Sequence, residues 1–248
     1  MEPSQINTSL VNTTSPPAPW AIILAGGLGT RLRSVVSDLP KCMAPVNGQP
    51  FLGYLVDSLH KQGITNIIFS VGYLHDVIVE YVTREFPFIN AKFSIEDEPL
   101  GTGGAILLAC TQCDSKTVVV CNGDTLFLAN VHDLLVFHNS VEADCTLSVK
   151  PMANFDRYGV ISLNDDHSVK GFKEKQWFDS GLINGGVYAL DVANFISIGL
   201  PAKFSFESSY LEAYYNRVKM FGFIQDSYFV DIGIPADYEK AQIELPLL

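Results

Sequence analysis

Residues Ala21–Leu52 read AIILAGGLGTRLRSVVSDLPKCMAPVNGQPFL and are the most informative stretch of this chain. The stretch opens within an apolar, partly β-branched run, Trp20–Ala25, which predicts a buried strand. A loop with Gly26, Gly27 and Gly29 follows, and glycine lets backbone N–H groups approach a ligand closely. A strand that ends in such a loop predicts a site for an anion.

Two permanent positive charges, Arg31 and Lys41, follow the glycines, and both residue types bind phosphate. Pro40 and Pro45 are expected to hold the segment between them extended, because proline fixes its own φ. Together these features predict a cradle for a triphosphate.

Two familiar phosphate loops do not fit this stretch. The dinucleotide fingerprint needs a third glycine three residues after Gly29, where this chain has Leu32. The Walker loop needs Gly-Lys-Ser/Thr, but Gly29 precedes Thr30-Arg31. A glycine-rich turn between a core strand and a surface helix remains the alternative without a function.

The composition limits the class of protein. With 248 residues, of which 48% are hydrophobic, the chain can form one large α/β domain or two small ones. Its formal net charge of −11 disfavours a nucleic-acid binder, which needs a basic face. Five cysteines, an odd number in apolar stretches, predict reduced, buried thiols.

The beginning of the chain differs from the rest. Residues 1–18 are rich in Ser, Thr, Asn and Pro and are expected to form a disordered tail, with one domain at 19–248. They lack the features of a secretory signal, and no stretch is apolar for long enough to span a membrane. We therefore expect a cytoplasmic protein without a membrane or nucleic-acid partner.

Strand-like and helix-like stretches alternate in the first half of the chain. The expected strands are Trp20–Ala25, Asn66–Val71, Lys92–Ile95 and Thr117–Cys121, and the expected helices are Phe51–Gly63, Leu74–Phe86 and Gly103–Cys110. This alternation predicts an α/β fold with a Rossmann-like, mixed and mostly parallel sheet that carries helices on both faces. Shorter strands dominate the second half, at Asp144–Lys150, Gly159–Leu163, Val169–Phe172 and Ile183–Leu190.

Polar residues lie where the apolar strands end. The loops after Ala25, Ile95 and Cys121 should meet at one edge of the sheet, where such folds bind ligands. Asp124 lies in the third of these loops, and Asp231 follows another apolar strand much later. A carboxylate in that position is costly to leave unpaired, so the two predict a shared Mg²⁺ site. Two separate helix caps are the alternative.

The glycine loop Gly26–Leu32 followed by Pro40-Lys41 resembles the signature of the sugar-1-phosphate nucleotidyltransferases. Within that family, Gly101–Ala105 and the compact length are most similar to the bacterial heptose-1-phosphate guanylyltransferases. The resemblance implies a nucleotidyltransferase domain of the glycosyltransferase-A-like type, with a sugar-binding lobe in its second half and homodimerisation by analogy. One departure is Cys42, where proline is usual, and this change could loosen the loop that carries Lys41.

The reaction that the resemblance implies joins a nucleoside triphosphate to a sugar 1-phosphate. A phosphate oxygen of the sugar attacks the α-phosphorus in line, and pyrophosphate leaves. Such a reaction needs Mg²⁺ and cations but little proton transfer. No catalytic Ser–His pair is expected, and none of the five histidines receives a role.

The resemblance also assigns roles to individual residues. The catalytic cations are Arg31 and Lys41, and the metal ligands are Asp124 and Asp231. The nucleotide-binding residues are Leu24, Ala25, Gly26, Gly27, Gly29, Thr30, Glu96, Glu98, Gly101, Thr102, Asn122 and Gly123. The residues for the sugar phosphate are Glu174, Lys175, Asn184 and Gly185, and a surface charge pair is the alternative for Glu174-Lys175.

The acidic stretch Glu96-Asp97-Glu98 favours guanine as the base. Guanine presents adjacent N1–H and N2–H₂ donors, which one carboxylate can accept together, whereas uracil and thymine suit an amide side chain. Glu98 or Glu96 is the expected reader, and solvated or ribose-contacting acids are the alternative.

Several functions stay open at this point. The sugar could be heptose or mannose, and a glucose-1-phosphate thymidylyl- or uridylyltransferase is a further alternative. A catalytically silent sensor of sugar nucleotides and a glycosyltransferase of similar topology belong to other classes. The presence of Lys41, Asp124 and Asp231 favours the active enzyme.

Overall fold

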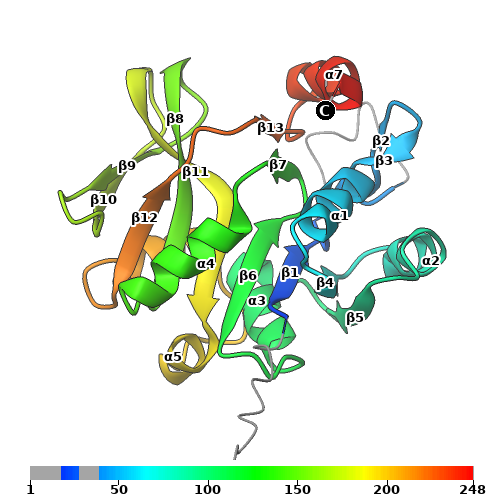
Figure 1. Cartoon of the computed structure of the whole chain (residues 1–248), viewed down its shortest axis with the longest axis horizontal. Coiled ribbons are helices and arrows are strands. Elements are labelled where there is room, and N and C mark those ends of the chain that lie inside the picture. The colour runs from blue at the N-terminus through cyan, green and yellow to red at the C-terminus, as the bar shows by residue number, and fades with distance from the viewer. Residues whose placement is uncertain (1–17, 28–38, 248) are drawn as a thin grey trace, which may run out of the picture.

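The computed structural model describes residues 18–27 and 39–247. Figure 1 shows a central twisted sheet with helices packed around it. The first half of the chain supplies four parallel strands in the spatial order β6-β1-β4-β5. These strands are β1 (Trp20–Leu24), β4 (Asn66–Val71), β5 (Asn90–Ile95) and β6 (Thr117–Asn122).

The second half of the chain extends the same sheet beyond β6, to nine strands in the described residues. The long strand β11 (Phe178–Asp191) runs antiparallel to β6 and carries β8 (Cys145–Phe155) and β9 (Val160–Leu163) as antiparallel neighbours. β10 (Val169–Lys173) pairs with β9, and β12 (Met220–Ile224) lies parallel to β8. The mixed sheet confirms the predicted fold class.

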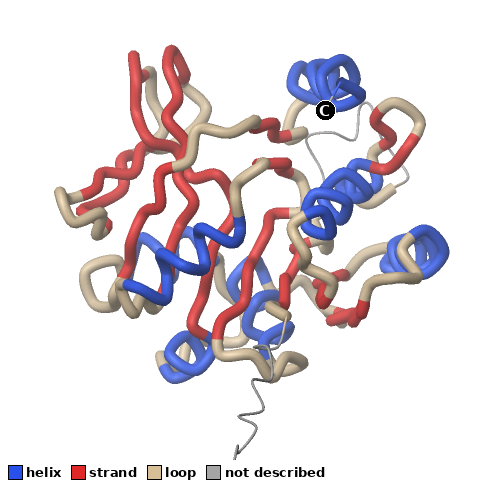
Figure 2. Tube along the Cα trace, in the orientation of Figure 1, coloured by secondary structure: helices blue, strands red, loops and turns tan. Residues whose placement is uncertain are grey.

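Helices cover both faces of the sheet, as the alternation of β1 requires (Figure 2). Ala21 and Ile23 point to one face of the sheet and belong to one hydrophobic cluster. Trp20 and Ile22 point to the other face and belong to a second cluster. The first cluster includes α1 (Phe51–Lys61), α2 (His75–Glu85), α4 (Val131–Ser140) and α7 (Pro235–Glu244). The second includes α3 (Gly101–Cys110), α5 (Val192–Ser197) and the π-helix η3 (Glu207–Leu211), which α6 (Glu212–Tyr214) continues.

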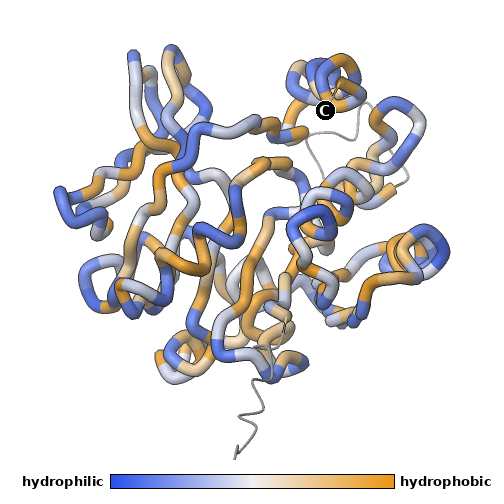
Figure 3. Tube along the Cα trace, viewed as in Figure 1, coloured by the Kyte–Doolittle hydropathy of each residue, from blue (hydrophilic) through white to orange (hydrophobic). Residues whose placement is uncertain are grey.

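Four of the five residues of β1 are buried. Ile22 and Ile23 are both 0% exposed, and burying one such side chain stabilises the fold by about 1.5–3 kcal/mol. Figure 3 shows apolar residues concentrated along the central strands and hydrophilic residues at the outer turns. None of the described helices combines the length and apolar character that crossing a membrane requires.

The segment between Pro40 and Pro45 is not extended as predicted. Lys41–Met43 forms a short 3₁₀ helix, η2, in which Met43 N donates to Pro40 O at 2.8 Å. The φ of Pro40 is −55°, a value that also suits the residue before a helical turn, so proline does not enforce an extended chain here. The small hairpin of β2 (Pro45–Val46) and β3 (Gln49–Pro50) follows.

The elements outside the set that the sequence pattern predicts include α4, β12 and β7 (Thr125–Phe127). β7 forms a two-stranded sheet with β13 (Phe229–Asp231), although the two are far apart in the sequence. Such a short pairing depends on tertiary contacts, which local periodicity cannot reveal.

His138 on α4 makes the stability of the fold depend on pH. Its side chain is 2% exposed, and Nδ1 lies 2.9 Å from Thr146 Oγ1 on β8. Burial lowers the pKa of His138 from 6.5 to about 4, with Asp191 opposing this shift. The folded state resists protonation of His138. The contribution of the neutral His138 side chain to the free energy of unfolding is therefore fully present above the unfolded pKa and is lost as the pH falls from 6.5 towards about 4.

We therefore expect His138→Gln to flatten this pH dependence. Between about pH 7 and about pH 4.5 the variant should lose about 2 kcal/mol less unfolding free energy than the unchanged protein. Urea unfolding at the two pH values measures the difference. Equal losses in both proteins would mean that folding does not lower the pKa of His138.

Candidate active site

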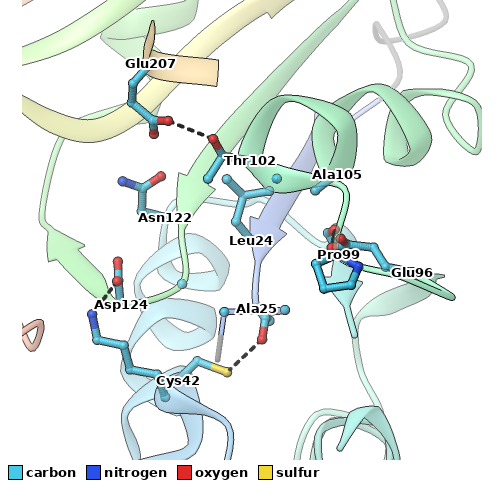
Figure 4. A pocket seen from close by; sticks show the side chains of 16 residues that line it. Leu24, Ala25, Cys42, Glu96, Pro99, Thr102, Ala105, Asn122, Asp124 and Glu207 are labelled. Atoms are coloured by element: carbon cyan, nitrogen blue, oxygen red, sulfur yellow. Dashed lines mark hydrogen bonds and ion pairs between the residues drawn. The ribbon is translucent and has the colours of Figure 1, made fainter. Parts of the chain in front are cut away.

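Two adjacent cavities meet at the end of β6, where Asn122 lines both. Figure 4 shows the first of them. The first has a volume of about 520 Å³ and lies between the ends of β1, β4 and β6 and the beginning of α3. It is lined by Leu24, Ala25, Gly26, Gly27, Lys41, Cys42, Ser70, Glu96, Pro99, Gly101, Thr102, Ala105, Asn122, Gly123, Asp124 and Glu207.

The second cavity has a volume of about 680 Å³ and lies between the strands of the second half and η3. Its lining includes Arg157, Tyr158, Lys173, Glu174, Lys175, Asn184, Tyr188, Glu212 and Asp231. Asn122 and Glu207 line both cavities, so the two share a wall.

Lys41, Asp124 and Asp231 form a charged cluster that reaches both cavities. Lys41 Nζ lies 2.5 Å from Asp124 Oδ2 and 4.0 Å from Asp231 Oδ1. The pairing of β7 with β13 sets Asp231 opposite Thr125, the residue after Asp124, and Ile232 N donates to Asp124 O at 3.0 Å. The two-stranded sheet of β7 and β13 therefore brings Asp124 and Asp231 close together.

The cluster pairs one lysine with two carboxylates. Lys41 is 9% exposed, and among residues 18–27 and 39–247 its ammonium group forms the ion pairs with Asp124 and Asp231. Burial and then the charge of Asp124 raise the pKa of Asp231, and Lys41 opposes that shift. A second cation bound here would relieve the repulsion between the carboxylates.

The donor set fits a hard divalent cation that keeps several other oxygen ligands. Asp124 and Asp231 offer carboxylate oxygens, which Mg²⁺ prefers. Within residues 18–27 and 39–247, no group of three or more His, Cys, Asp or Glu side chains could hold a metal ion. A metal at the two carboxylates would thus need substrate phosphate and water to complete its coordination.

The glycines of the first cavity allow close contacts. A Cβ on Gly123 would lie 2.3 Å from Leu24 O, and Gly123 N donates to that oxygen at 3.1 Å. A Cβ on Gly26 would lie 2.9 Å from Glu96 Oε1. The lack of side chains at Gly123 and Gly26 therefore lets the loops after β1 and β6 and the Glu96 side chain pack closely around the first cavity.

Of the acidic residues after β5, only Glu96 lines the first cavity. Its Oε2 accepts a hydrogen bond from Leu100 N at 2.8 Å, and its Oε1 accepts one from Ser70 Oγ at 3.4 Å. A carboxylate has about four acceptor positions, so Glu96 keeps capacity for a ligand. Glu98 is exposed and lines neither cavity.

Cys42 holds the Lys41 turn against β1. Its thiol donates to Ala25 O at 3.7 Å, and its side chain is 2% exposed. Burial, with a smaller contribution from Asp124, raises the pKa of Cys42 to about 12, so the group stays a neutral donor. The contact anchors the turn directly after Lys41 to the end of β1.

Three of the four residues predicted to bind the sugar phosphate line the second cavity, and Gly185 does not. Glu174 and Lys175 are exposed at the second cavity, and Asn184 lines it with Nδ2 donating to Tyr188 Oη at 2.8 Å. Gly185 lines neither cavity, because it is buried against Phe127, where a Cβ would lie 2.3 Å from that ring. Its absence of a side chain permits packing rather than contact with a ligand.

Other parts of the predicted and observed sites do not overlap. Gly29, Thr30 and Arg31 lie outside the described residues. The structure adds cavity residues that the sequence does not single out: Ser70, Arg157, Tyr158, Lys173, Glu207 and Glu212. Ser70 lies near the end of β4, where folds of this type bind ligands, so the sequence pattern could have indicated it. Glu207 carries no sequence signal.

Arg157 links the second cavity to α7. Its guanidinium donates to the carboxylate of Asp237, and Tyr238 Oη and Gln242 Nε2 on the same helix donate to Pro45 O. Since Pro45 closely follows the Lys41 turn, α7 joins the lobe of the second cavity to the segment that carries the site lysine (Figure 1).

Comparisons with known proteins agree with this architecture. The chain is 51% identical to the D-glycero-alpha-D-manno-heptose 1-phosphate guanylyltransferase of Aneurinibacillus thermoaerophilus, covering 91% of this chain and 97% of that one. It is 44% identical to the enzyme of the same name from Campylobacter jejuni, covering 88% and 96%. The crystal structure of HddC from Yersinia pseudotuberculosis complexed with GMP-PN matches with a TM-score of 0.80 and 38% identity, covering 92% and 99%.

A family model points the same way. The model described as nucleotidyl transferase matches residues 20–246, which include both cavities and the Lys41 cluster. The match spans far more than half of the 248 residues. This chain is a member of the nucleotidyl transferase family.

Proposed function

We propose that this protein transfers GMP from GTP to D-glycero-α-D-manno-heptose 1-phosphate, giving the GDP-sugar and pyrophosphate. The observation that carries this proposal is the sequence identity of 51% and 44%, over 91% and 88% of this chain, to two D-glycero-alpha-D-manno-heptose 1-phosphate guanylyltransferases. The paired cavities support it, because one suits a nucleotide, the other a sugar, and the charged cluster reaches both.

The reaction follows from charge and position. A phosphate oxygen of the sugar attacks the α-phosphorus of GTP, a P–O bond forms, and the bond to pyrophosphate breaks with its electron pair on the leaving group. The attacking oxygen is already an anion, so no general base is needed. Consistently, none of the five histidines lines either cavity.

Lys41 and the two aspartates are the chain's own contribution to the chemistry. Lys41 binds a phosphate oxygen and stabilises the charge that develops there. Asp124 and Asp231 would hold Mg²⁺ as the divalent ion, which would orient the phosphates and neutralise their charge. Arg31 is proposed to act beside Lys41 on the triphosphate.

The remaining residues bind the two substrates. Leu24, Ala25, Gly26, Gly27, Gly29, Thr30, Gly101, Thr102, Asn122 and Gly123 are proposed to surround the nucleotide, and Glu174, Lys175 and Asn184 the sugar phosphate. Residues 19–248 would act as one catalytic domain, with the second half as its sugar-binding lobe. The cytoplasmic location and homodimerisation stay predictions.

A coupled assay of pyrophosphate release tests the reaction. The protein incubated with GTP, the heptose 1-phosphate and Mg²⁺ should release pyrophosphate only when both substrates are present. Chelation of the metal should stop the release, and added Mg²⁺ should restore it. Pyrophosphate absent from every combination of substrates would favour the silent sensor of sugar nucleotides.

Glu96 is the proposed reader of guanine, because it alone of the acidic stretch lines the first cavity. Its carboxylate would accept both N1–H and N2–H₂, whereas glutamine would turn one donor towards the base. We expect Glu96→Gln to lower kcat/KM for GTP about 10- to 100-fold, as loss of a hydrogen bond to a charged group does.

Inosine triphosphate, which lacks the 2-amino group, checks the assignment. The unchanged protein should prefer GTP to ITP, and Glu96→Gln should largely lose that preference. The matched change Glu98→Gln, on an exposed carboxylate outside both cavities, should preserve it. The opposite pattern would assign guanine recognition to Glu98.

A further inference from the structure

Glu207 occupies the wall that the two cavities share. It begins η3 and approaches Thr102, the second residue of α3, from a distant part of the chain (Figure 4). Of the described residues, Glu207 and Asn122 alone line both cavities. A group in this place is next to both substrates at once.

Hydrogen bonds fix the orientation of this carboxylate. Glu207 Oε2 accepts from Thr102 Oγ1 at 2.7 Å and from Ser205 Oγ at 2.9 Å. The hydroxyl of Thr102 is itself held, because it accepts from Phe206 N at 2.8 Å. Among residues 18–27 and 39–247, none hydrogen-bonds to Glu207 Oε1. One oxygen is thus anchored and the other is left for a ligand.

The position of the bonded oxygen, Oε2, indicates which cavity Oε1 faces. Thr102 lines only the first cavity and occupies Oε2. Beyond Glu207, the same helical segment continues along the second cavity with Leu211 and Glu212. We infer from this order that Oε1 serves the second cavity.

The charges of the second cavity indicate which part of a sugar phosphate Glu207 would meet. Its cations, Arg157, Lys173 and Lys175, come from the β8–β9 turn, β10 and the loop after β10. The η3–α6 segment contributes the carboxylates Glu207 and Glu212 and no cation. A phosphate would avoid these carboxylates, whereas a sugar hydroxyl donates to them readily.

We propose that Glu207 is a specificity-determining residue that accepts a hydrogen bond from one hydroxyl of the sugar 1-phosphate. This proposal rests on the proposed function, since it names a contact within the same reaction. A carboxylate fixed in advance loses little entropy when it binds the hydroxyl. A substrate that lacks the hydroxyl would leave the carboxylate oxygen unpaired, so it would bind more weakly.

Monodeoxy analogues of the sugar 1-phosphate test this contact. For the unchanged protein, one analogue should show kcat/KM about 10- to 100-fold below that of the parent sugar. In Glu207→Gln and Glu207→Asp, the parent should be penalised and that same analogue should lose nothing further. The control Glu239→Gln removes an exposed carboxylate on α7 outside both cavities and should retain the full discrimination.

Two further measurements separate the alternatives. If Glu207 only holds Thr102, the variants should raise KM for GTP and leave the analogue penalties unchanged, which would overturn the proposal. If it contacts the ribose, the lost discrimination should appear between GTP and its 2′- or 3′-deoxy forms, which would also overturn it. Calorimetric binding of the sugar 1-phosphates gives the same comparison without turnover, including for a variant that is inactive.

Failure of the proposed function would look different. If the unchanged protein used another sugar 1-phosphate, the heptose assignment would be wrong, and the deoxy panel would be made in the series of the sugar that is used. Loss of discrimination in Glu207→Gln would still support the contact there, and unchanged discrimination would overturn it.

Discussion

Lys41→Ala is expected to lower kcat by about 10²- to 10³-fold, the usual effect of removing one preorganised charge contact. Lys41 Nζ is the cation that the structure places between Asp124 and Asp231. Without it, two carboxylates would face the triphosphate, and phosphate binding would meet repulsion instead of attraction. Pyrophosphate release under saturating substrates measures the effect.

A matched control separates chemistry from general charge. Lys61→Ala removes an exposed lysine at the end of α1, away from both cavities, and should leave kcat unchanged. Thermal unfolding should show that the Lys41→Ala protein is folded. Ordinary turnover in Lys41→Ala would remove the lysine from the mechanism and leave the triphosphate to other cations.

Asp124→Asn and Asp231→Asn should each lower kcat by orders of magnitude and raise the Mg²⁺ concentration needed for half-maximal activity. The amide keeps the shape of the side chain but loses the negative charge that binds a hard cation. The control Asp165→Asn, in an exposed turn outside both cavities, should change neither quantity. Metal titrations of pyrophosphate release provide both values.

The stability of Asp231→Asn should not follow its activity. Because the pKa of Asp231 is raised in the folded state, its ionised form costs stability at neutral pH, and a neutral amide removes that cost. Asparagine can also still accept the hydrogen bond that Gly233 N donates to Asp231 Oδ1 at 2.7 Å. We expect unfolding of the metal-free variant to require as much urea or more. An active Asp231→Asn enzyme would show that Asp231 only caps this turn.

Local patterns predict the framework of the fold well. β4 (Asn66–Val71) has the predicted bounds, and β1 and α1 differ from prediction only at their ends. These elements are buried by apolar residues in regular spacing, so the pattern itself carries the information. The expectation that ligands bind where parallel strands end likewise predicts the place of Asp124, which lines the first cavity.

Long-range contacts account for most of what the sequence does not predict. Asp231 meets Asp124 through the pairing of β7 with β13, which involves three-residue strands too short to recognise. Glu207 reaches the shared wall because η3 packs on α3, although nothing around residue 207 marks a site. Exposure decides between Glu96 and Glu98, and exposure depends on the whole fold.

The extended segment between Pro40 and Pro45 fails for a local reason. A fixed φ is compatible with a helical turn as well as with extended chain, so two prolines do not determine what lies between them. The 3₁₀ turn of η2 buries Lys41, which an extended chain would not ensure.

The most direct test of guanylyl transfer to a heptose is a matrix of relative kcat/KM values. GTP, ATP, CTP, UTP and dTTP are each combined with heptose, mannose and glucose 1-phosphate. GTP with D-glycero-α-D-manno-heptose 1-phosphate should give the highest value, with the wrong bases penalised about 10²-fold or more by unpaired buried polar groups. A clear preference for UTP or dTTP over GTP, or for mannose or glucose 1-phosphate over the heptose, would contradict it.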